Sequence, residues 1–263
     1  MSRLGVTLAW TMLVISLLFL MAPIIVVIPV SFNEGAVFRF PPRGFSWRWY
    51  EAIRNVDEIL SALALSAQIA ALSTAIALLL GTLASIAIVR GKLPGGEAVA
   101  TFLASPLMLP GLVMGIAMLQ AFRAAGVYDA KAALLLAHVV VTMPFIMRTV
   151  LASLALFDFA MVDAARTLGC SYMAALWKVL VPNILPGFMS GALFAFIASF
   201  DNYPVSMFLT DVRNKTLPIQ LLNRIEMSPD PTLAAISTVL ILLTILALLV
   251  CDRLVGLRRM ATL

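Results

Sequence analysis

The chain has 263 residues, of which 62% are hydrophobic and only 12% are charged, and its mean hydropathy is +1.05. Soluble domains average roughly a quarter charged residues, so this composition excludes a large soluble domain and indicates several membrane spans. The formal net charge of +5 is modest, and the basic residues form no stripe interleaved with aromatic residues. This pattern argues against a nucleic-acid partner and favours the anionic inner leaflet of a membrane.

The first apolar run, Leu8–Val30, is longer than the hydrophobic part of a typical signal peptide, and no small-residue cleavage site follows it. We therefore expect a retained first span. Ser31–Asp57 then forms a polar segment rich in proline, glycine and aromatic residues, which we place outside the membrane. Trp47, Trp49 and Tyr50 are of the type that lies among lipid headgroups, so we expect this segment along the outer interface.

The second and third spans are predicted over Ile59–Val89 and Ala98–Phe122, joined by a basic turn rich in glycine and proline. The third contains two prolines and a glycine in its first half. Such residues are tolerated where neighbouring helices satisfy the backbone or where the helix lines a cavity. Met108 and Pro110 are therefore candidate residues of a pathway or gate, and a plain kink accommodated by packing is the alternative.

Three more spans are predicted over Ala132–Val150, Ile184–Phe200 and Thr232–Val250. An external helix within 205–230 precedes the last span, and a basic tail over Asp252–Leu263 follows it. His138, the only histidine, lies in the middle of the fourth span. An interhelical hydrogen bond is one interpretation of this residue, and a ligand site is the other. We find no sequence repeat and no second domain.

A charged, amphipathic stretch, Met161–Pro186, separates the fourth and fifth apolar runs. Asp163 falls in the first turn of a predicted helix, where the positive end of the helix dipole favours a carboxylate. Gly169 can adopt the left-handed conformation that ends a helix, and Ser171 can cap the next one. Pro182 and the final proline of the stretch are expected to end this second helix.

The spacing resembles the Glu-Ala-Ala loop found in permease subunits of ABC importers. The matching positions are Asp163, Ala164, Ala165, Gly169, Val179, Val181 and Pro182, with Asp in place of Glu and Val in place of Ile and Leu. The resemblance implies that a loop over about 158–183 faces the cytoplasm and couples to an ATPase, with Asp163, Ala164, Ala165, Gly169, Val179 and Pro182 as its coupling residues. An ordinary pair of helices lying on the membrane surface is the alternative.

Two further stretches extend the resemblance over essentially the whole chain: SFN with GFSWRWY, and SFDNYP with TLPIQLLNRIE. They are similar to the spermidine/putrescine branch of type I ABC importer permeases. The resemblance implies an all-α fold with six transmembrane helices in one permease domain, residues 1–263, in a bacterial inner membrane with both termini cytoplasmic. In this orientation nine Lys and Arg residues fall on each side, so the positive-inside rule gives a tie and the orientation rests on the resemblance.

The sequence contains no phosphate-binding loop, no HExxH motif, no cysteine cluster and no Ser–His–Asp combination within one compartment. We therefore expect a non-catalytic subunit that holds no metal and no cofactor of its own. Cys170 and Cys251 lack metal-ligand spacing, and neither a disulfide nor a zinc site is expected. Under the resemblance, ATP and magnesium bind to partner subunits.

Asp201 closes the fifth apolar run, and ionisable groups at such depth are costly unless they are paired or face water. With Asn202 and Tyr203, it offers a carboxylate, hydrogen bonds and a ring face to an ammonium group. The alternative is that Asp201 is solvated, or caps the helix that begins at the following proline. Glu226 and Asp230 add negative potential at the external mouth, or are ordinary solvated acids.

The resemblance implies import of a small organic solute by alternating access, and a polyamine is the expected substrate. An opine, an amino acid derivative or a phosphonate is the alternative within this class. An ion-coupled secondary transporter and a membrane enzyme are the alternatives outside it. The implied partners are a second homologous permease, two ATPase subunits, an extracytoplasmic solute-binding protein and membrane lipid, with no nucleic acid.

Overall fold

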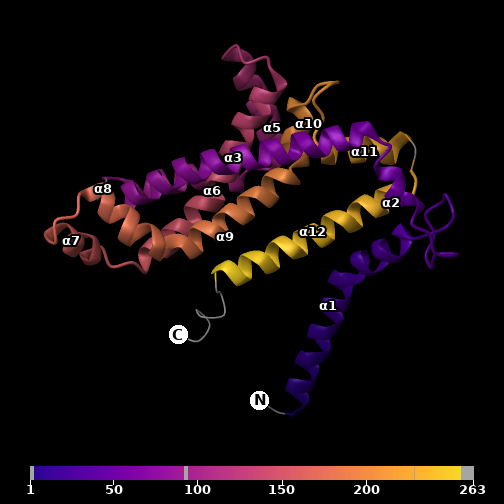
Figure 1. Ribbon diagram of the computed structural model, residues 1–263, viewed down its shortest axis with the longest axis horizontal. Coiled ribbons are helices and arrows are strands. Elements are labelled where there is room, and N and C mark those ends of the chain that lie inside the picture. The colour runs from indigo at the N-terminus through magenta and orange to yellow at the C-terminus, as the bar shows by residue number, and fades with distance from the viewer. Residues whose placement is uncertain (1–2, 92–93, 228, 256–263) are drawn as a thin grey trace. The chain divides into compact units, whose positions relative to one another are not determined.

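The computed structural model describes residues 3–91, 94–227 and 229–255, and every regular element within these ranges is helical. In chain order they are α1 (Arg3–Ser31), α2 (Arg48–Ile53), α3 (Asp57–Arg90), α4 (Gly96–Ala104), the 3-10 turn η1 (Ser105–Met108), α5 (Gly111–Ala124), α6 (Ala130–Ala155), α7 (Ala160–Thr167), α8 (Tyr172–Ala175), the π-helical turn η2 (Leu176–Leu180), α9 (Val181–Phe200), α10 (Tyr203–Leu209), α11 (Leu217–Met227) and α12 (Thr232–Val255) (Figure 1). The predicted all-α class is confirmed. The basic tail expected over Asp252–Leu263 lies largely outside the described residues.

Within the described ranges, five helical stretches are long and apolar enough to cross a membrane: Gly5–Ser31, Asp57–Arg90, Ala130–Ala155, Tyr172–Phe200 and Thr232–Cys251. The sixth predicted span is present as a bent pair, Gly96–Met108 followed by Gly111–Ala124, with 108° between the two pieces. The bend falls at Pro110, which lacks a backbone N–H, and the preceding Leu109 is extended, with φ −90° and ψ 140°. The described residues therefore contain six spans if the bent pair is counted as one.

The chain divides into two compact units. The first consists of Met1–Leu60 with Leu221–Leu246, and the second consists of Ser61–Gln220 with Ala247–Leu263. All of the candidate coupling and pathway residues belong to the second unit. The expectation of one permease domain over residues 1–263 stays a prediction.

In the first unit, the segment between α1 and α2 is folded around the side chain of Asn33, which is only 2% exposed. Its amide donates to the carbonyl of Val37 over 2.9 Å, and its amide oxygen accepts from the backbone N–H of Arg43 over 3.2 Å. The indole N–H of Trp49 donates to the Asn33 carbonyl over 2.7 Å. The side chain of Trp49 is therefore buried inside this segment and is not available to headgroups, whereas Trp47 is exposed. The place of the segment along the outer interface stays a prediction.

Two acids that either add negative potential at an external mouth or are ordinary solvated acids belong to this unit. Glu226 is exposed, but Asp230 accepts hydrogen bonds from Arg224 over 2.7 Å and from the backbone N–H of Thr232 over 2.8 Å. Burial by itself would raise the pKa of Asp230, but these hydrogen bonds and the positive charge of Arg224 outweigh burial and lower the pKa below its usual range. Asp230 is thus a paired residue at the start of α12.

In the second unit, α3, α6 and α9 lie alongside one another, and α7 and α8 lie at the end of the unit where α3 finishes (Figure 1). Small residues allow this close packing. Gly81 of α3 lies against Ile146 of α6, and a Cβ at Gly191 of α9 would collide with the side chain of Thr149 on α6. The bundle therefore supplies a packed framework for the short helices at its end.

Candidate functional site

The stretch predicted to couple to an ATPase forms two short helices joined by a tight turn. Asp163 lies in the first turn of α7, as predicted. Gly169 has φ +92°, the left-handed conformation that a glycine adopts without steric cost, and the hydroxyl of Ser171 accepts from the backbone N–H of Ala174 over 3.3 Å. We call residues 158–183 the coupling segment from here on.

One side of the coupling segment is buried in the core of the second unit. Val162 of α7, Ala175 of α8 and Leu180 of η2 are fully buried, in one cluster with Ile146 and Ile184. Of the predicted coupling residues, Val179 packs against the edge of this cluster and Ala165 does the same, whereas Asp163, Ala164, Gly169 and Pro182 are exposed. The segment is therefore joined to α6 and α9 through apolar packing.

The other side of the coupling segment is exposed and carries three large apolar side chains beside charged ones such as Arg166 and Lys178. Leu168 is 87% exposed, Trp177 is 70% exposed and Met173 is 65% exposed. Large apolar side chains gathered on an exposed surface are typical of protein or membrane contacts. The surface opposite the core is thus suited to a partner.

The prolines of this segment do not end its second helix, contrary to the prediction. The chain runs from α8 through η2 directly into α9. Pro182 lies in the first turn of α9, just after the π-helical turn, and Pro186 lies inside α9. A π-helical turn bonds each N–H to a carbonyl five residues back, so the missing N–H of Pro182 is accommodated by the change of hydrogen-bond pattern rather than by ending the helix.

Arg90, at the end of α3, joins the coupling segment from outside it. One guanidinium nitrogen lies 2.6 Å from a carboxylate oxygen of Asp163. The guanidinium also lies over the rings of Phe159 and Tyr172, 5.0 and 6.0 Å from their centres. Arg166 lies farther from the same carboxylate, at 3.9 Å. The sequence predicts only a basic turn at Arg90, and nothing in it indicates a contact between residues 73 positions apart.

The predicted pathway residues form the corner between α9 and α10. Asp201 is the residue directly after α9, and Asn202, not Asp201, caps α10 by accepting from the backbone N–H of Val205 over 3.1 Å. The hydroxyl of Tyr203 donates to the sulfur of Met207 over 3.2 Å. The capping alternative for Asp201 is therefore wrong, because the next residue performs that role.

The carboxylate of Asp201 is exposed, and among the described residues none donates a hydrogen bond to it. The protein atoms around it nevertheless withdraw part of its hydration, which raises the pKa of the carboxyl above its usual range. A carboxylate in this condition is stabilised by any cation that reaches it. Asn202 and Tyr203 flank it but do not neutralise it.

The bent third span is packed against this same corner. A Cβ at Gly111 would lie 2.8 Å from the side chain of Pro204, and one at Gly115 would lie 2.6 Å from the ring of Phe208. The structure thus brings the start of α5, with Pro110 as the residue before it, to the start of α10. Met108 lies in the 3-10 turn before the bend and is 75% exposed. The predicted kink is confirmed, and the predicted gate stays a prediction.

His138 fixes this corner to α6. Its Nδ1 lies 2.7 Å from the hydroxyl of Ser199 on α9, and its Nε2 lies 3.0 Å from the hydroxyl of Ser206 on α10. Ser199 in turn lies 3.1 Å from the hydroxyl of Ser73 on α3. The interhelical interpretation of His138 is confirmed, and both nitrogens of its ring are occupied. The two serines stand two residues before and five residues after Asp201, so this network holds both sides of the corner.

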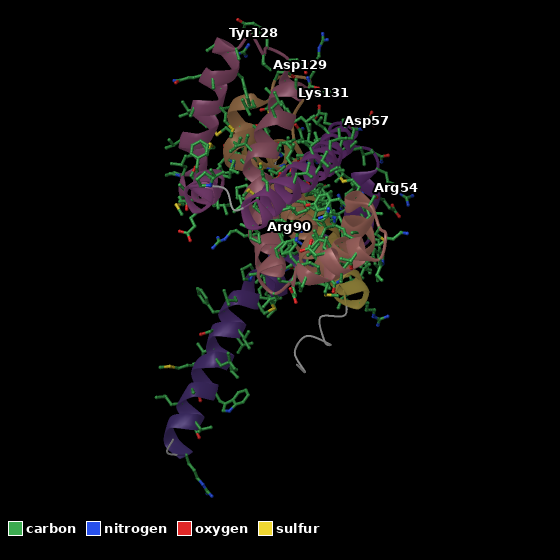
Figure 2. The ribbon with its side chains drawn as sticks, turned by 90° about the vertical axis from the view of Figure 1, so that its left-hand side faces the viewer. Arg54, Asp57, Arg90, Tyr128, Asp129 and Lys131 are labelled. Carbon is green, nitrogen blue, oxygen red and sulfur yellow. The ribbon has the colours of Figure 1, made fainter. Side chains whose placement is uncertain are left out.

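The two predicted groups of functional residues lie at different ends of the second unit. Figure 2 shows Tyr128, Asp129 and Lys131 together at the loop between α5 and α6, away from Arg90 at the end of α3. The α5–α6 loop is close to α10, because Arg123, Tyr128 and residues 208–211 line one small pocket. The exposed surface of the coupling segment and the carboxylate of Asp201 thus lie at opposite ends of the continuous stretch from α8 through η2 to α9.

Comparison with known proteins decides the family. The model of the family described as binding-protein-dependent transport system inner membrane component matches residues 77–258. The chain belongs to this family. The spermidine/putrescine transport system permease protein PotC of Haemophilus influenzae is 34% identical to this transport-system component, over 90% of this chain and 91% of its own. The putrescine transport system permease protein PotI of Escherichia coli K12 is 29% identical, over 87% and 84% of the two chains.

Solved structures agree on the fold. A chain of a bacterial ABC transporter involved in the import of the acidic polysaccharide alginate matches with a TM-score of 0.74 and 18% identity, over 96% of this chain and 98% of its own. The predicted type I importer permease fold is confirmed. As a binding-protein-dependent transport component, the chain is a multi-pass inner-membrane permease, and its family implies a partner ATPase and a binding protein.

Proposed function

We propose that this chain is a membrane-spanning subunit of an ATP-driven importer for polyamines. The observation that carries the proposal is its 34% identity to a spermidine/putrescine permease over 90% of the chain. The unpaired carboxylate of Asp201 supports a cationic solute, because a partly desolvated negative charge favours an ammonium group over an anion or a neutral solute. Opines, phosphonates and amino acid derivatives carry carboxylate or phosphonate groups that Asp201 would repel, even where they also carry an ammonium group, whereas every charge of a polyamine is positive.

The proposed assembly contains a second homologous permease, two ATPase subunits, an extracytoplasmic binding protein and membrane lipid. The coupling segment faces the cytoplasm, as do both termini, and its exposed Leu168, Met173 and Trp177 contact an ATPase. ATP and magnesium bind to the ATPases, and this chain catalyses no reaction. The continuity of α8, η2 and α9 supports this arrangement, because a displacement of the coupling segment is passed along one helical stretch.

In this mechanism, ATP-driven closure of the ATPases displaces the coupling segment and opens the pathway to the outside. A polyamine released by the binding protein then meets Asp201, Asn202 and Tyr203, with Met108 and Pro110 beside the bend of the third span. Replacing part of the hydration of each ammonium by a carboxylate and a ring face lowers the cost of entering the pathway. ATP hydrolysis resets the inward-facing state.

The experiment is purification of the whole transporter in detergent, expressed from its own operon with the chain tagged. We expect the ATPases to copurify and their activity to rise when binding protein loaded with spermidine or putrescine is added. Binding protein mixed with an opine or a phosphonate is the control. Stimulation by one of these solutes and not by a polyamine would contradict the proposed substrate, and the absence of any ATPase would contradict the proposed class.

A further inference from the structure

We propose that Arg90 links the coupling segment to α3, and that Asp163 acts through this pair inside the chain rather than as a contact to the ATPase. The inference rests on the proposed function, because it concerns how ATPase movement reaches the spans. The resemblance of the Glu-Ala-Ala loop places an acidic residue at this position without saying what it binds. The structure supplies a partner for it within the same chain.

The pair is well formed on both sides. A carboxylate oxygen of Asp163 lies 2.6 Å from the guanidinium of Arg90, which is short for a charge-assisted hydrogen bond. The side chain of Arg90 is 23% exposed, compared with 55% for Asp163, so the cation is the better shielded partner. Phe159, directly before α7, and Tyr172, the first residue of α8, place their rings beside the same guanidinium. Arg90 therefore contacts both short helices of the coupling segment at once.

The chain path and the buried core give the routes by which a displacement of the coupling segment would reach the spans. A displacement of the coupling segment reaches α9 directly, since α8, η2 and α9 are continuous. It reaches α6 through the buried core around Val162 and Ala175. The residues Ala77 and Ile86 of α3 pack in this same core. Arg90, the last residue of α3, adds a polar contact to Asp163, which lies 73 positions later in the sequence. An ion pair that is flanked by two aromatic rings fixes the position of the coupling segment relative to the end of α3, because a guanidinium binds a carboxylate in a fixed geometry.

Arg166 provides a matched control within the same cluster. It lies on α7 itself, 3.9 Å from the same carboxylate and 5.7 Å from the ring of Tyr172. Its removal takes away one positive charge beside Asp163 but leaves α3 attached. If the charge around Asp163 were all that mattered, Arg166→Gln and Arg90→Gln would have similar effects.

The experiment measures polyamine transported per ATP hydrolysed, in proteoliposomes that contain the whole transporter and excess loaded binding protein. For Arg90→Gln we expect the ATPases to copurify normally and the transport ratio to fall about fivefold. This is the largest effect expected from the loss of one well-formed, partly exposed ion pair. For Arg166→Gln we expect a change of less than about twofold, because exposed pairs at this distance contribute little. Arg90→Lys keeps the charge but not the fixed geometry, so its transport ratio should lie between the ratios of Arg90→Gln and of the unaltered chain.

The double variant Arg90→Glu/Asp163→Arg decides where Asp163 acts. If the pair acts inside the chain, exchanging its charges restores most of the ratio that either single variant loses. If the double variant has a transport ratio as low as the single variants, in transporters that still contain the ATPases, Asp163 acts at the ATPase and the inference is overturned. A normal transport ratio in Arg90→Gln would overturn it too. Failure of the unaltered transporter to couple ATP to uptake would instead refute the proposed function.

Discussion

At the scale of single residues, Asp201 and Gly169 are suited to their proposed roles because each has no group that another residue would have at that position. Asp201 lacks a hydrogen-bond donor among the described residues, and Gly169 lacks a side chain where the backbone is left-handed. Trp49 shows the opposite case, because its indole N–H is fully used by the Asn33 carbonyl. Residue type alone suggested a headgroup contact for Trp49, and only its hydrogen-bond partner shows that it is structural.

Asp201→Asn is expected to weaken uptake of a cationic solute. The change keeps the size of the side chain and removes its charge, and losing one ion pair in a partly desolvated site costs about 1–3 kcal/mol, or roughly ten- to a hundredfold in apparent affinity. The measurement is spermidine uptake with the binding protein saturated. Asp211→Asn is the control, since that carboxylate already accepts from the backbone N–H groups of Asn214 and Arg213. Equal uptake by the Asp201 variant and the unaltered chain would remove Asp201 from the pathway.

Gly169→Val is expected to abolish coupling without preventing membrane insertion. Nothing lies within 4 Å of a Cβ built at Gly169, so the cost is backbone strain at φ +92°, about 1–2 kcal/mol. The turn between α7 and α8 should relax and move both helices away from their place. Transport and ATPase stimulation by loaded binding protein are the measurements. Gly95→Val, at φ +78° with equally open space, imposes the same strain outside the coupling segment and should be tolerated better. Normal transport by the Gly169 variant would contradict the assignment of the turn.

At the scale of elements, helix contacts set the positions of the short segments. Hydropathy predicts the long helices well, because a span needs only length and apolar composition. It does not predict the 108° bend at Pro110 or the π-helical turn that carries the chain past Pro182, since both depend on how neighbouring helices satisfy the backbone. A proline can end a helix, bend it or lie in its first turn, and the sequence alone does not distinguish these cases. The end predicted for the second short helix was therefore wrong.

The buried network around His138 is expected to hold α9 and α10 in register with α6. His138→Ala removes two hydrogen bonds and leaves the hydroxyls of Ser199 and Ser206 to find other partners, at a cost of about 1 kcal/mol for the two bonds inside a membrane. We expect a lower thermal unfolding temperature of the purified transporter. Ser190→Ala is the control, because that hydroxyl bonds only to the carbonyl of Pro186 within its own helix. If both variants unfold at the same temperature as the unaltered chain, the network does not stabilise the corner.

At the scale of the whole molecule, the arrangement of functional residues at two ends of the second unit could be predicted only in part. The order of spans and loops alternates the two sides of a membrane, which separates the coupling segment from the α5–α6 loop. The distribution of charge does not show which side is cytoplasmic, because nine Lys and Arg residues fall on each side. The pairing of Arg90 with Asp163 was not predictable, since it joins residues 73 positions apart through the packing of α3 beside the segment.

Cysteine labelling tests the orientation. Cys170 follows the turn of the coupling segment and is half-buried, whereas Cys251 is buried, and these are the two cysteines of the chain. A membrane-impermeant maleimide added to intact cells should not label Cys170. It should label Cys170 in inverted vesicles stripped of the ATPases, and Cys170→Ala should remove this labelling. Rapid labelling in intact cells would invert the proposed topology.

The central claim is that this chain passes a polyamine across the membrane under the control of ATPases at its coupling segment. The most direct measurement is spermidine accumulation in proteoliposomes that contain the whole transporter, with ATP on the coupling-segment side and loaded binding protein on the other. We predict accumulation that requires both and stops when ATP is replaced by a non-hydrolysable analogue. Accumulation driven by an ion gradient in the absence of ATP, or indifferent to the binding protein, would contradict the account.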